Sequence, residues 1–135
     1  MRLEGVNGVA EASLISIIDD DASLRQALSG LLRALGRRVR DFESAEAFLA
    51  SDAVAESACV VTDIHMPGLS GIALKQRLVA SGVDAPVIMI TGRGEPALRS
   101  RAFASGAVCV LEKPFSPDAL NDCIVRALAA RAGVG

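Results

Sequence analysis

Four apolar segments of this chain each run into residues that could take part in phosphoryl chemistry. Asp19–Asp21 follow the first segment, Asp63 the second, Thr91 the third and Lys113 the fourth. Carboxylates can bind a divalent metal, and one carboxylate can act as a nucleophile towards a phosphoryl group. A hydroxyl and an ammonium group can then bind the oxygens of the added phosphate. We therefore interpret the four segment ends as candidates for one site.

The acidic run Asp19–Asp21 has two interpretations. Neighbouring carboxylates repel one another, by about 4 kcal/mol for two charges roughly 4 Å apart at an effective dielectric constant of about 20. They need a cation, full solvation or raised pKa values to remain together. Alternatively, the run caps the helix that follows, because acidic side chains are favoured at a helix N-terminus. The run on its own supports both interpretations equally.

Lys113 and Thr91 differ in how strongly each residue, taken alone, indicates a phosphoryl-binding site. Lys113 lies between Glu112 and Pro114 at the end of an apolar segment, where a lysine has little structural purpose unless it extends to the surface. Thr91 is a weak signal by type, because threonine is common in strands. Its position is more informative, since it ends an apolar segment and enters a glycine-containing loop.

The segments that must position these residues alternate between strand and helix patterns. Short apolar runs predict strands at Leu14–Ile18, Arg38–Phe42, Ala58–Thr62, Pro86–Ile90 and Val108–Leu111. Apolar spacing, serine caps and glycines predict the helices between and after them, from about Leu24 to Leu35, at 45–50, 70–80 and 96–105, and from Pro117 to about 131.

A strand followed by a helix, five times over, predicts a parallel sheet with helices on both faces. We expect an α/β, flavodoxin-like, doubly wound fold with five strands in the order 2-1-3-4-5. In that order the strands ending at Asp20 and Asp63 are neighbours. Their oxygens then converge at the carboxyl edge of the sheet, as a Mg²⁺ site requires.

Composition excludes some classes of function. The 135 residues fit one domain, and 51% hydrophobic residues suffice for a core. The formal net charge of −2 gives no reason to expect nucleic-acid or membrane binding. We find no signal peptide and no apolar run long enough to span a bilayer. The basic run of Arg37, Arg38 and Arg40 is interpreted as a solvated or edge strand face, in preference to a phosphate-binding patch.

The three cysteines are Cys59, Cys109 and Cys123. They lie in apolar segments and lack the spacing of a metal site or a Cys-x-x-Cys motif. We therefore expect three buried, reduced thiols, as in a cytosolic protein.

Five motifs run through nearly the whole chain, from about Leu14 to Leu128. They are Ile-Ile-Asp-Asp-Asp, Ser-Ala-Glu-Ala-Phe-Leu, Thr-Asp-Ile-His-Met-Pro-Gly-Leu-Ser-Gly, Pro-Val-Ile-Met-Ile-Thr-Gly and Glu-Lys-Pro-Phe. In their order and spacing the chain resembles the receiver (CheY-like) domain of two-component response regulators, and the FixJ-like subgroup in particular. The resemblance implies a receiver domain at 13–131, with a flexible lead-in at 1–12 and a tail at 132–135.

The resemblance also implies roles for single residues. Asp63 accepts a phosphoryl group from the phosphohistidine of a sensor histidine kinase, and Thr91 and Lys113 bind the phosphoryl oxygens. The Lys113–Pro114 peptide bond is expected to be cis, which is feasible because proline follows. Such a protein is a cytoplasmic phospho-acceptor in signalling, which catalyses only its own phosphorylation and dephosphorylation and is not otherwise an enzyme.

The metal ligands follow from the same resemblance. Asp20 binds Mg²⁺ directly, Asp19 binds it mainly through water, and Asp63 also contributes. The backbone carbonyl of His65 completes the protein ligands, whereas Asp21 matches a position that is often acidic but not essential.

Two positions raise separate hypotheses. The family often carries an aromatic residue three positions before the lysine, but this chain has Val110. Valine cannot swing a large ring, so either the switch runs mainly through loop 91–95 and the next helix, or it is weak. His65 is the only histidine. It is either an exposed loop residue or a side chain facing Arg93 that controls the access of water to the acyl phosphate.

The output face implied by the resemblance is 96–131, through which a phosphorylated homodimer could form. Charged side chains there either pair across such a dimer or form an ordinary solvated helix face; they are Arg99, Arg101, Asp118, Asp122 and Arg126.

Two other functions remain open. One is a haloacid-dehalogenase-type aspartyl phosphatase, although that class places an Asp-x-Asp motif after its first strand. The other is a receiver fold that binds partners without phosphorylation, against which Asp20, Asp63, Thr91 and Lys113 argue.

Overall fold

The computed structural model describes residues 13–92 and 94–131. The predicted lead-in at 1–12, the predicted tail at 132–135 and Arg93 lie outside the described residues. No helix in the described part of the chain combines the length and the apolar character that a bilayer span requires.

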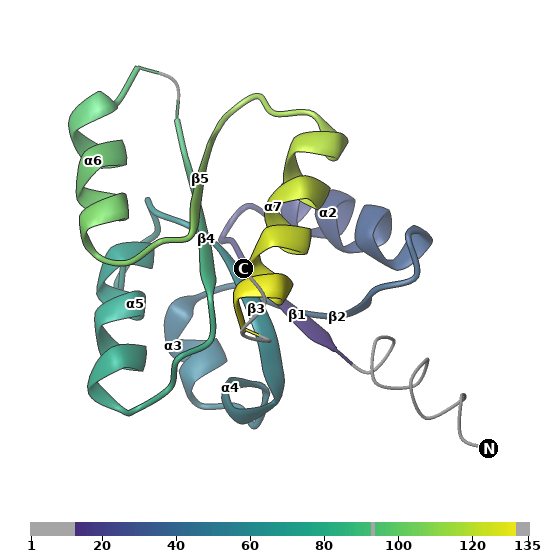
Figure 1. The fold of residues 1–135 in the computed structure, drawn as a ribbon, viewed down its shortest axis with the longest axis horizontal. Coiled ribbons are helices and arrows are strands. Elements are labelled where there is room, and N and C mark those ends of the chain that lie inside the picture. Colours follow the sequence, from purple (N-terminus) through teal and green to yellow (C-terminus); the bar gives the residue numbers. More distant parts are fainter. Residues whose placement is uncertain (1–12, 93, 132–135) are drawn as a thin grey trace.

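Within the described residues, five parallel strands form one sheet, shown in Figure 1, in the order β2-β1-β3-β4-β5. The predicted order 2-1-3-4-5 is therefore confirmed. The strands are β1 (Leu14–Ile18), β2 (Arg38–Phe42), β3 (Ser57–Asp63), β4 (Val87–Thr91) and β5 (Cys109–Glu112).

Burial explains why the strand sequences differ. The three central strands, β1, β3 and β4, are buried along their whole length, which matches their continuous apolar runs. The edge strand β2 is only partly buried and carries Arg38 and Arg40 of the basic run. Arg38 pairs with Glu56 at 2.9 Å and Arg40 with Asp52 at 2.6 Å, so the interpretation of an edge strand face is confirmed.

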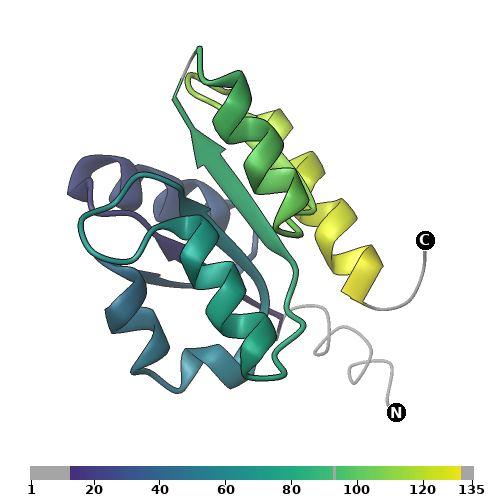
Figure 2. The ribbon, with the colours of Figure 1, turned by 90° about the vertical axis from the view of Figure 1, so that its left-hand side faces the viewer.

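Helices cover both faces of the sheet, as Figures 1 and 2 show. On one face, α2 (Ala22–Ala34) and α7 (Pro117–Arg131) pack on the sheet through aliphatic side chains such as Leu32 and Ile124. The other face is covered by α3 (Ala45–Leu49), α5 (Gly71–Ala80) and α6 (Pro96–Ala104).

The predicted helix starts are confirmed where a serine precedes the helix. The hydroxyls of Ser44, Ser70 and Ser116 each accept a hydrogen bond from the backbone N–H three residues later. One short helix, α4 (Ala53–Glu56), was not predicted. Its single turn is too short to produce a recognisable apolar period.

The prediction of three reduced thiols is right for one cysteine and wrong for two. Cys59 is a free, buried thiol. Cys109 on β5 and Cys123 on α7 form a disulfide, with their Cα atoms 6.0 Å apart. Their sequence separation of 14 residues resembles no motif, and only the packing of α7 against β5 brings the two sulfurs together.

Candidate functional site

The carboxyl ends of four strands bring the predicted residues to one edge of the sheet. Asp63 and Thr91 are the last residues of β3 and β4. Asp19 and Asp20 directly follow β1, and Lys113 directly follows β5. Because β1 and β5 flank the β3–β4 pair, all five side chains start from neighbouring positions.

Three carboxylates form a cluster at this edge. Oxygen atoms of Asp19, Asp20 and Asp63 all lie within 4.8 Å of one another. Asp19 and Asp63 are buried, whereas Asp20 is exposed. Burial is the main cause that raises the pKa of Asp19 and of Asp63 above the ordinary value, and Lys113 opposes the rise at both. The cluster therefore holds negative charge in a place that disfavours it.

The third acid of the run, Asp21, has a different role. Its Oδ1 atom accepts a hydrogen bond from the N–H of Leu24 at 3.1 Å, which makes it the N-cap of α2. Its own N–H donates to Asp19 Oδ1 at 2.9 Å and so orients that carboxylate. Both interpretations of the acidic run thus hold, for different residues: Asp21 caps a helix, and Asp19 and Asp20 belong to the cluster.

The cluster fits a hard divalent cation. Asp19 Oδ2 is buried and has no hydrogen-bond partner among the described residues. Such an atom costs about 1–3 kcal/mol unless something satisfies it. Carboxylate oxygens are the ligands that hard cations prefer, and a cation here would satisfy the oxygen and offset the repulsion. The carbonyl of His65, which the resemblance adds to the ligands, belongs to the loop directly after β3.

Lys113 supplies the positive charge of the site. Its Nζ atom lies 3.5 Å from Asp63 Oδ2. Its backbone N–H donates to the carbonyl of Thr91 at 2.9 Å, so β4 and β5 are joined up to the site. The Lys113–Pro114 peptide bond is cis, as predicted.

Thr91 is fully buried, and its hydroxyl is bound to a residue that the sequence interpretation missed. Thr91 Oγ1 donates to Glu95 Oε1 at 3.2 Å. The other carboxylate oxygen of Glu95 bonds His65 Nε2 at 2.9 Å. The bond to His65 is the main cause that lowers the pKa of Glu95. The sequence did contain one signal for this contact, because Glu95 lies four residues after Thr91 in the loop that follows it.

His65 is exposed, with 63% of its side chain accessible. This agrees with the interpretation of an exposed loop residue. The hypothesis that it faces Arg93 concerns a residue outside those described, and the partner that the structure shows is Glu95.

Gly71 supports the loop that follows Asp63. A Cβ atom at this position would lie 2.6 Å from the carbonyl oxygen of Asp63 and 3.1 Å from Thr62 Cγ2. The Gly71 N–H donates to the carbonyl of Ile64 at 3.1 Å. The start of α5 can therefore pack directly against the end of β3, which fixes the backbone that carries Asp63.

Comparison with known proteins identifies the family. Residues 15–125 match the family model of the response regulator receiver domain. Nodulation protein W of Bradyrhizobium diazoefficiens is 37% identical over 126 residues, which are 91% of this chain and 56% of that protein. The transcriptional regulatory protein FixJ of the same organism is 42% identical over 114 residues, 84% of this chain and 56% of that protein. This chain spans about half the length of these curated relatives.

Solved structures agree. The crystal structure of FixJ-N superimposes with a TM-score of 0.80 at 35% identity, covering 86% of this chain and 93% of that chain. Full-length FixJ from B. japonicum gives a TM-score of 0.80 at 41% identity, covering 88% of this chain and 59% of that chain. The chain therefore belongs to the response regulator receiver family, the phosphorelay signalling domains of two-component systems.

Proposed function

We propose that Asp63 is the residue that accepts the phosphoryl group. The observation that carries this proposal is the position of its carboxylate at the end of β3. It belongs to the cluster with Asp19 and Asp20, and its Oδ2 atom lies 3.5 Å from Lys113 Nζ. The side chain is only 10% exposed, yet it lies at the open carboxyl edge of the sheet. Lys113 also lowers the pKa of Asp19, but among the described residues its ion pair is with Asp63.

The donor in this proposal is the phosphohistidine of a sensor histidine kinase. An oxygen of the Asp63 carboxylate attacks the phosphorus atom, an O–P bond forms and the N–P bond breaks. The imidazole leaves with the electron pair and takes up a proton. The product is an acyl phosphate on Asp63, and its hydrolysis by water returns the carboxylate.

Asp19, Asp20, Asp63 and the carbonyl of His65 would hold Mg²⁺. Bound there, the ion would offset the negative charge of the transferring phosphoryl oxygens. Asp21 keeps Asp19 oriented for this role through its backbone N–H.

Thr91 and Lys113 would convert the modification into a change of shape. The phosphoryl group adds about −1.5 to −2 charges near Lys113. The Thr91 hydroxyl would then leave Glu95 and donate to a phosphoryl oxygen. Because Glu95 precedes α6 directly, losing this bond changes the start of that helix and biases an equilibrium between two conformations.

The output surface in this proposal is formed by α6, β5 and α7, and a second phosphorylated copy would bind there. Arg99 on α6 already donates to the carbonyl of Val110 on β5 at 3.2 Å. Val110 is buried and has no ring to reorient. The signal would therefore pass mainly through loop 91–95 and α6. We place this signalling in the cytoplasm, where the kinase would supply the phosphoryl group.

Acetyl phosphate with Mg²⁺ tests the proposal. We expect the intact mass of the wild type to rise by one phosphoryl group, and sedimentation to show a larger dimeric fraction. Asp63→Asn should show neither change. Asp21→Asn is the matched control, because asparagine also caps helices well and the variant should still be modified. A phosphorylated Asp63→Asn protein would contradict the assignment of the acceptor.

The same experiment separates the remaining alternatives. Family membership argues against the haloacid-dehalogenase-type phosphatase. Asp19 and Asp21 have the spacing Asp-x-Asp after β1, but Asp21 caps α2, and the acid that pairs with Lys113 is Asp63 after β3. A receiver fold that acts without phosphorylation would gain no mass from acetyl phosphate. The carboxylate cluster and Lys113 favour the phosphorylated mechanism.

A further inference from the structure

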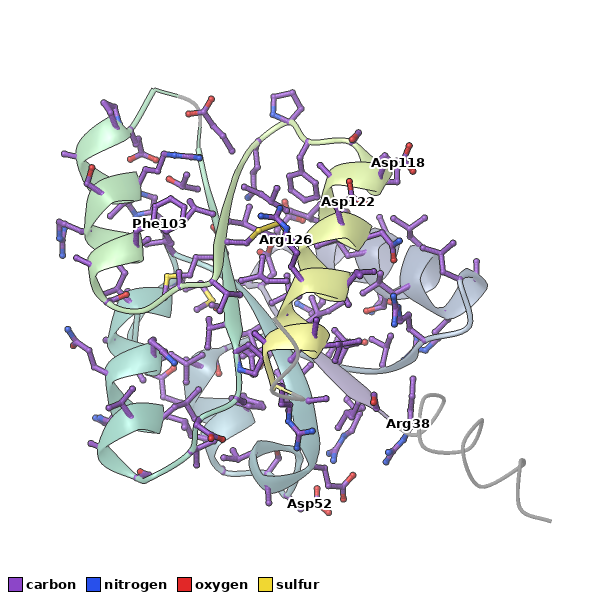
Figure 3. The ribbon with its side chains drawn as sticks, in the orientation of Figure 1. Arg38, Asp52, Phe103, Asp118, Asp122 and Arg126 are labelled. Carbon is purple, nitrogen blue, oxygen red and sulfur yellow. A yellow bond between two sulfur atoms is a disulfide. The ribbon has the colours of Figure 1, made fainter. Side chains whose placement is uncertain are left out.

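The Cys109–Cys123 disulfide lies on a part of the surface that the phosphoryl site does not use. A pocket of about 290 Å³ lies between α6, β5 and α7 and is lined by both cysteines, by Phe103 and by Arg126. In Figure 3, Phe103 extends from α6 and Arg126 from α7, and the disulfide joins β5 to α7. The Cα separation of 6.0 Å is within the range of about 4.4–6.8 Å seen for ordinary disulfides.

Both cysteines are almost completely buried, and the pocket is the route by which they can be reached. Cys109 is 5% exposed and Cys123 only 1%, so a reagent must enter the pocket to reach them. Cys59 differs, because it is fully buried and burial raises the pKa of its thiol to about 12. Cys59 is therefore an inert thiol within the same domain.

Arg126 makes the two sulfurs of the disulfide chemically unequal. Its Nη2 atom lies 3.7 Å from Cys123 Sγ. A guanidinium at this distance stabilises a thiolate on Cys123, and a stabilised thiolate is the better leaving group in thiol–disulfide exchange. Cys109 is the more exposed residue of the pair, and its sulfur is then the one that an incoming thiolate attacks.

We propose that Cys109 and Cys123 form a redox modification site that exchanges with small thiols such as glutathione through this pocket. In the disulfide form, α7 is tied covalently to β5. In the dithiol form, only non-covalent packing holds the two elements together.

The exchange between the disulfide and glutathione takes place in two steps. A glutathione thiolate attacks Cys109 Sγ, the Cys109–Cys123 bond breaks, and Cys123 leaves with the electron pair as a thiolate. A second glutathione thiolate attacks the glutathione sulfur of the mixed disulfide and releases Cys109. Two glutathione molecules are oxidised to their disulfide, and the cysteine pair is reduced by two electrons and two protons. Oxidised glutathione reverses both steps.

A consequence for signalling rests on the proposed function. α7 and β5 are part of the proposed output surface, and Cys109 is next to Val110 in β5. Tying α7 to β5 restricts the rearrangement of that surface after phosphorylation. The disulfide form should therefore dimerise several-fold more weakly when phosphorylated than the dithiol form.

The exchange is tested on folded Asp63→Asn protein, so that phosphorylation plays no part. The protein is incubated with reduced or oxidised glutathione, quenched in acid, unfolded and alkylated, and its intact mass is measured. We expect one alkyl group, on Cys59, after oxidised glutathione and three after reduced glutathione. Three groups under both conditions, or one under both, would overturn the proposal.

Variants sharpen this test. Cys59→Ser should keep the exchange, with no groups in the oxidised form and two in the reduced form. Arg126→Gln should slow the exchange several-fold, whereas Arg77→Gln on α5 should leave its rate unchanged. Equal rates for Arg126→Gln and the wild type would contradict the leaving-group role assigned to Cys123.

The predicted effect of the disulfide on dimerisation needs a separate measurement. Wild-type protein in each redox form is phosphorylated with acetyl phosphate and sedimented. Equal dimerisation of the two forms would refute the link to the output surface. A lack of mass gain in both forms would instead count against the proposed function and leave the exchange result intact.

Discussion

At the scale of residues, the hydroxyl of Thr91 has two competing partners. In the structure it donates to Glu95, which His65 also holds. In the proposed phosphorylated state it donates to a phosphoryl oxygen. Since one hydroxyl proton cannot serve both acceptors, Glu95 stabilises the unphosphorylated conformation.

We therefore predict that Glu95→Ala favours phosphorylation. Losing the competing bond should shift the phosphorylation equilibrium by about 1 kcal/mol, or roughly fivefold. The measurement is the phosphorylated fraction at a fixed concentration of acetyl phosphate, read by intact mass. Glu56→Ala removes a carboxylate that is bonded to Arg38, far from the site, and should have no effect. An equal fraction in the Glu95 and Glu56 variants would contradict a role for Glu95 in holding Thr91.

At the scale of elements, the junction between β3 and α5 fixes the backbone of the proposed phosphoryl site. The first residue of α5 is Gly71, and its α-carbon hydrogens face the carbonyl of Asp63 where a side chain would not fit. The strand end that carries Asp63 and the start of the helix are thus packed backbone against backbone. A methyl group at this junction must move one of them.

Gly71→Ala should accordingly destabilise the domain by about 1–3 kcal/mol, the usual cost of overpacking. It should also slow phosphorylation, because the backbone of Asp63 is displaced. Urea unfolding and the rate of mass gain with acetyl phosphate measure the two effects. Gly30→Ala is the matched control: it lies within α2, nothing is within 4 Å of the added carbon, and it should stabilise by up to about 1 kcal/mol. Similar behaviour of the two variants would exclude a special role for Gly71.

At the scale of the whole molecule, the acidic cluster opposes the stability of the fold. Asp19 and Asp63 have pKa values that are raised, mainly by burial. A raised pKa means that the folded state binds the proton more tightly than the unfolded state does. The stability that these groups contribute is present at acid pH and is lost as pH rises through their folded pKa values.

At neutral pH without metal, we therefore expect Asp63→Asn to be more stable than the wild type. The advantage should shrink as pH falls through the raised pKa of Asp63. Mg²⁺ should stabilise the wild type at neutral pH, because the ion favours the folded state with the carboxylates ionised. Urea unfolding with Mg²⁺ or with a chelator measures both effects. Asp84→Asn, an exposed acid before β4, serves as the control. A wild type that is no less stable than Asp63→Asn without metal would contradict the raised pKa.

The sequence by itself determined the fold and which strand ends form the candidate site. Apolar runs and helical spacing reflect burial, which is strong enough to fix each element, and the alternation of strand and helix leaves a parallel sheet as the natural arrangement. In such a sheet the strand ends share one edge, so Asp63, Thr91 and Lys113 could be placed together before any distance was known. The short helix α4 was not predicted because a single helical turn contains no repeat of apolar residues.

The tertiary structure alone decided the partners of those residues. It divided Asp19–Asp21 between a cluster of carboxylates and a helix cap, and it showed Glu95 bonded to Thr91. It also joined Cys109 to Cys123, which the sequence had suggested were reduced thiols. The physical reason is that hydrogen bonds, ion pairs and disulfides form only between atoms a few ångströms apart. These short distances depend on how separate elements pack against one another. The periodicity of apolar residues describes each helix or strand alone and gives no distance between side chains on different elements.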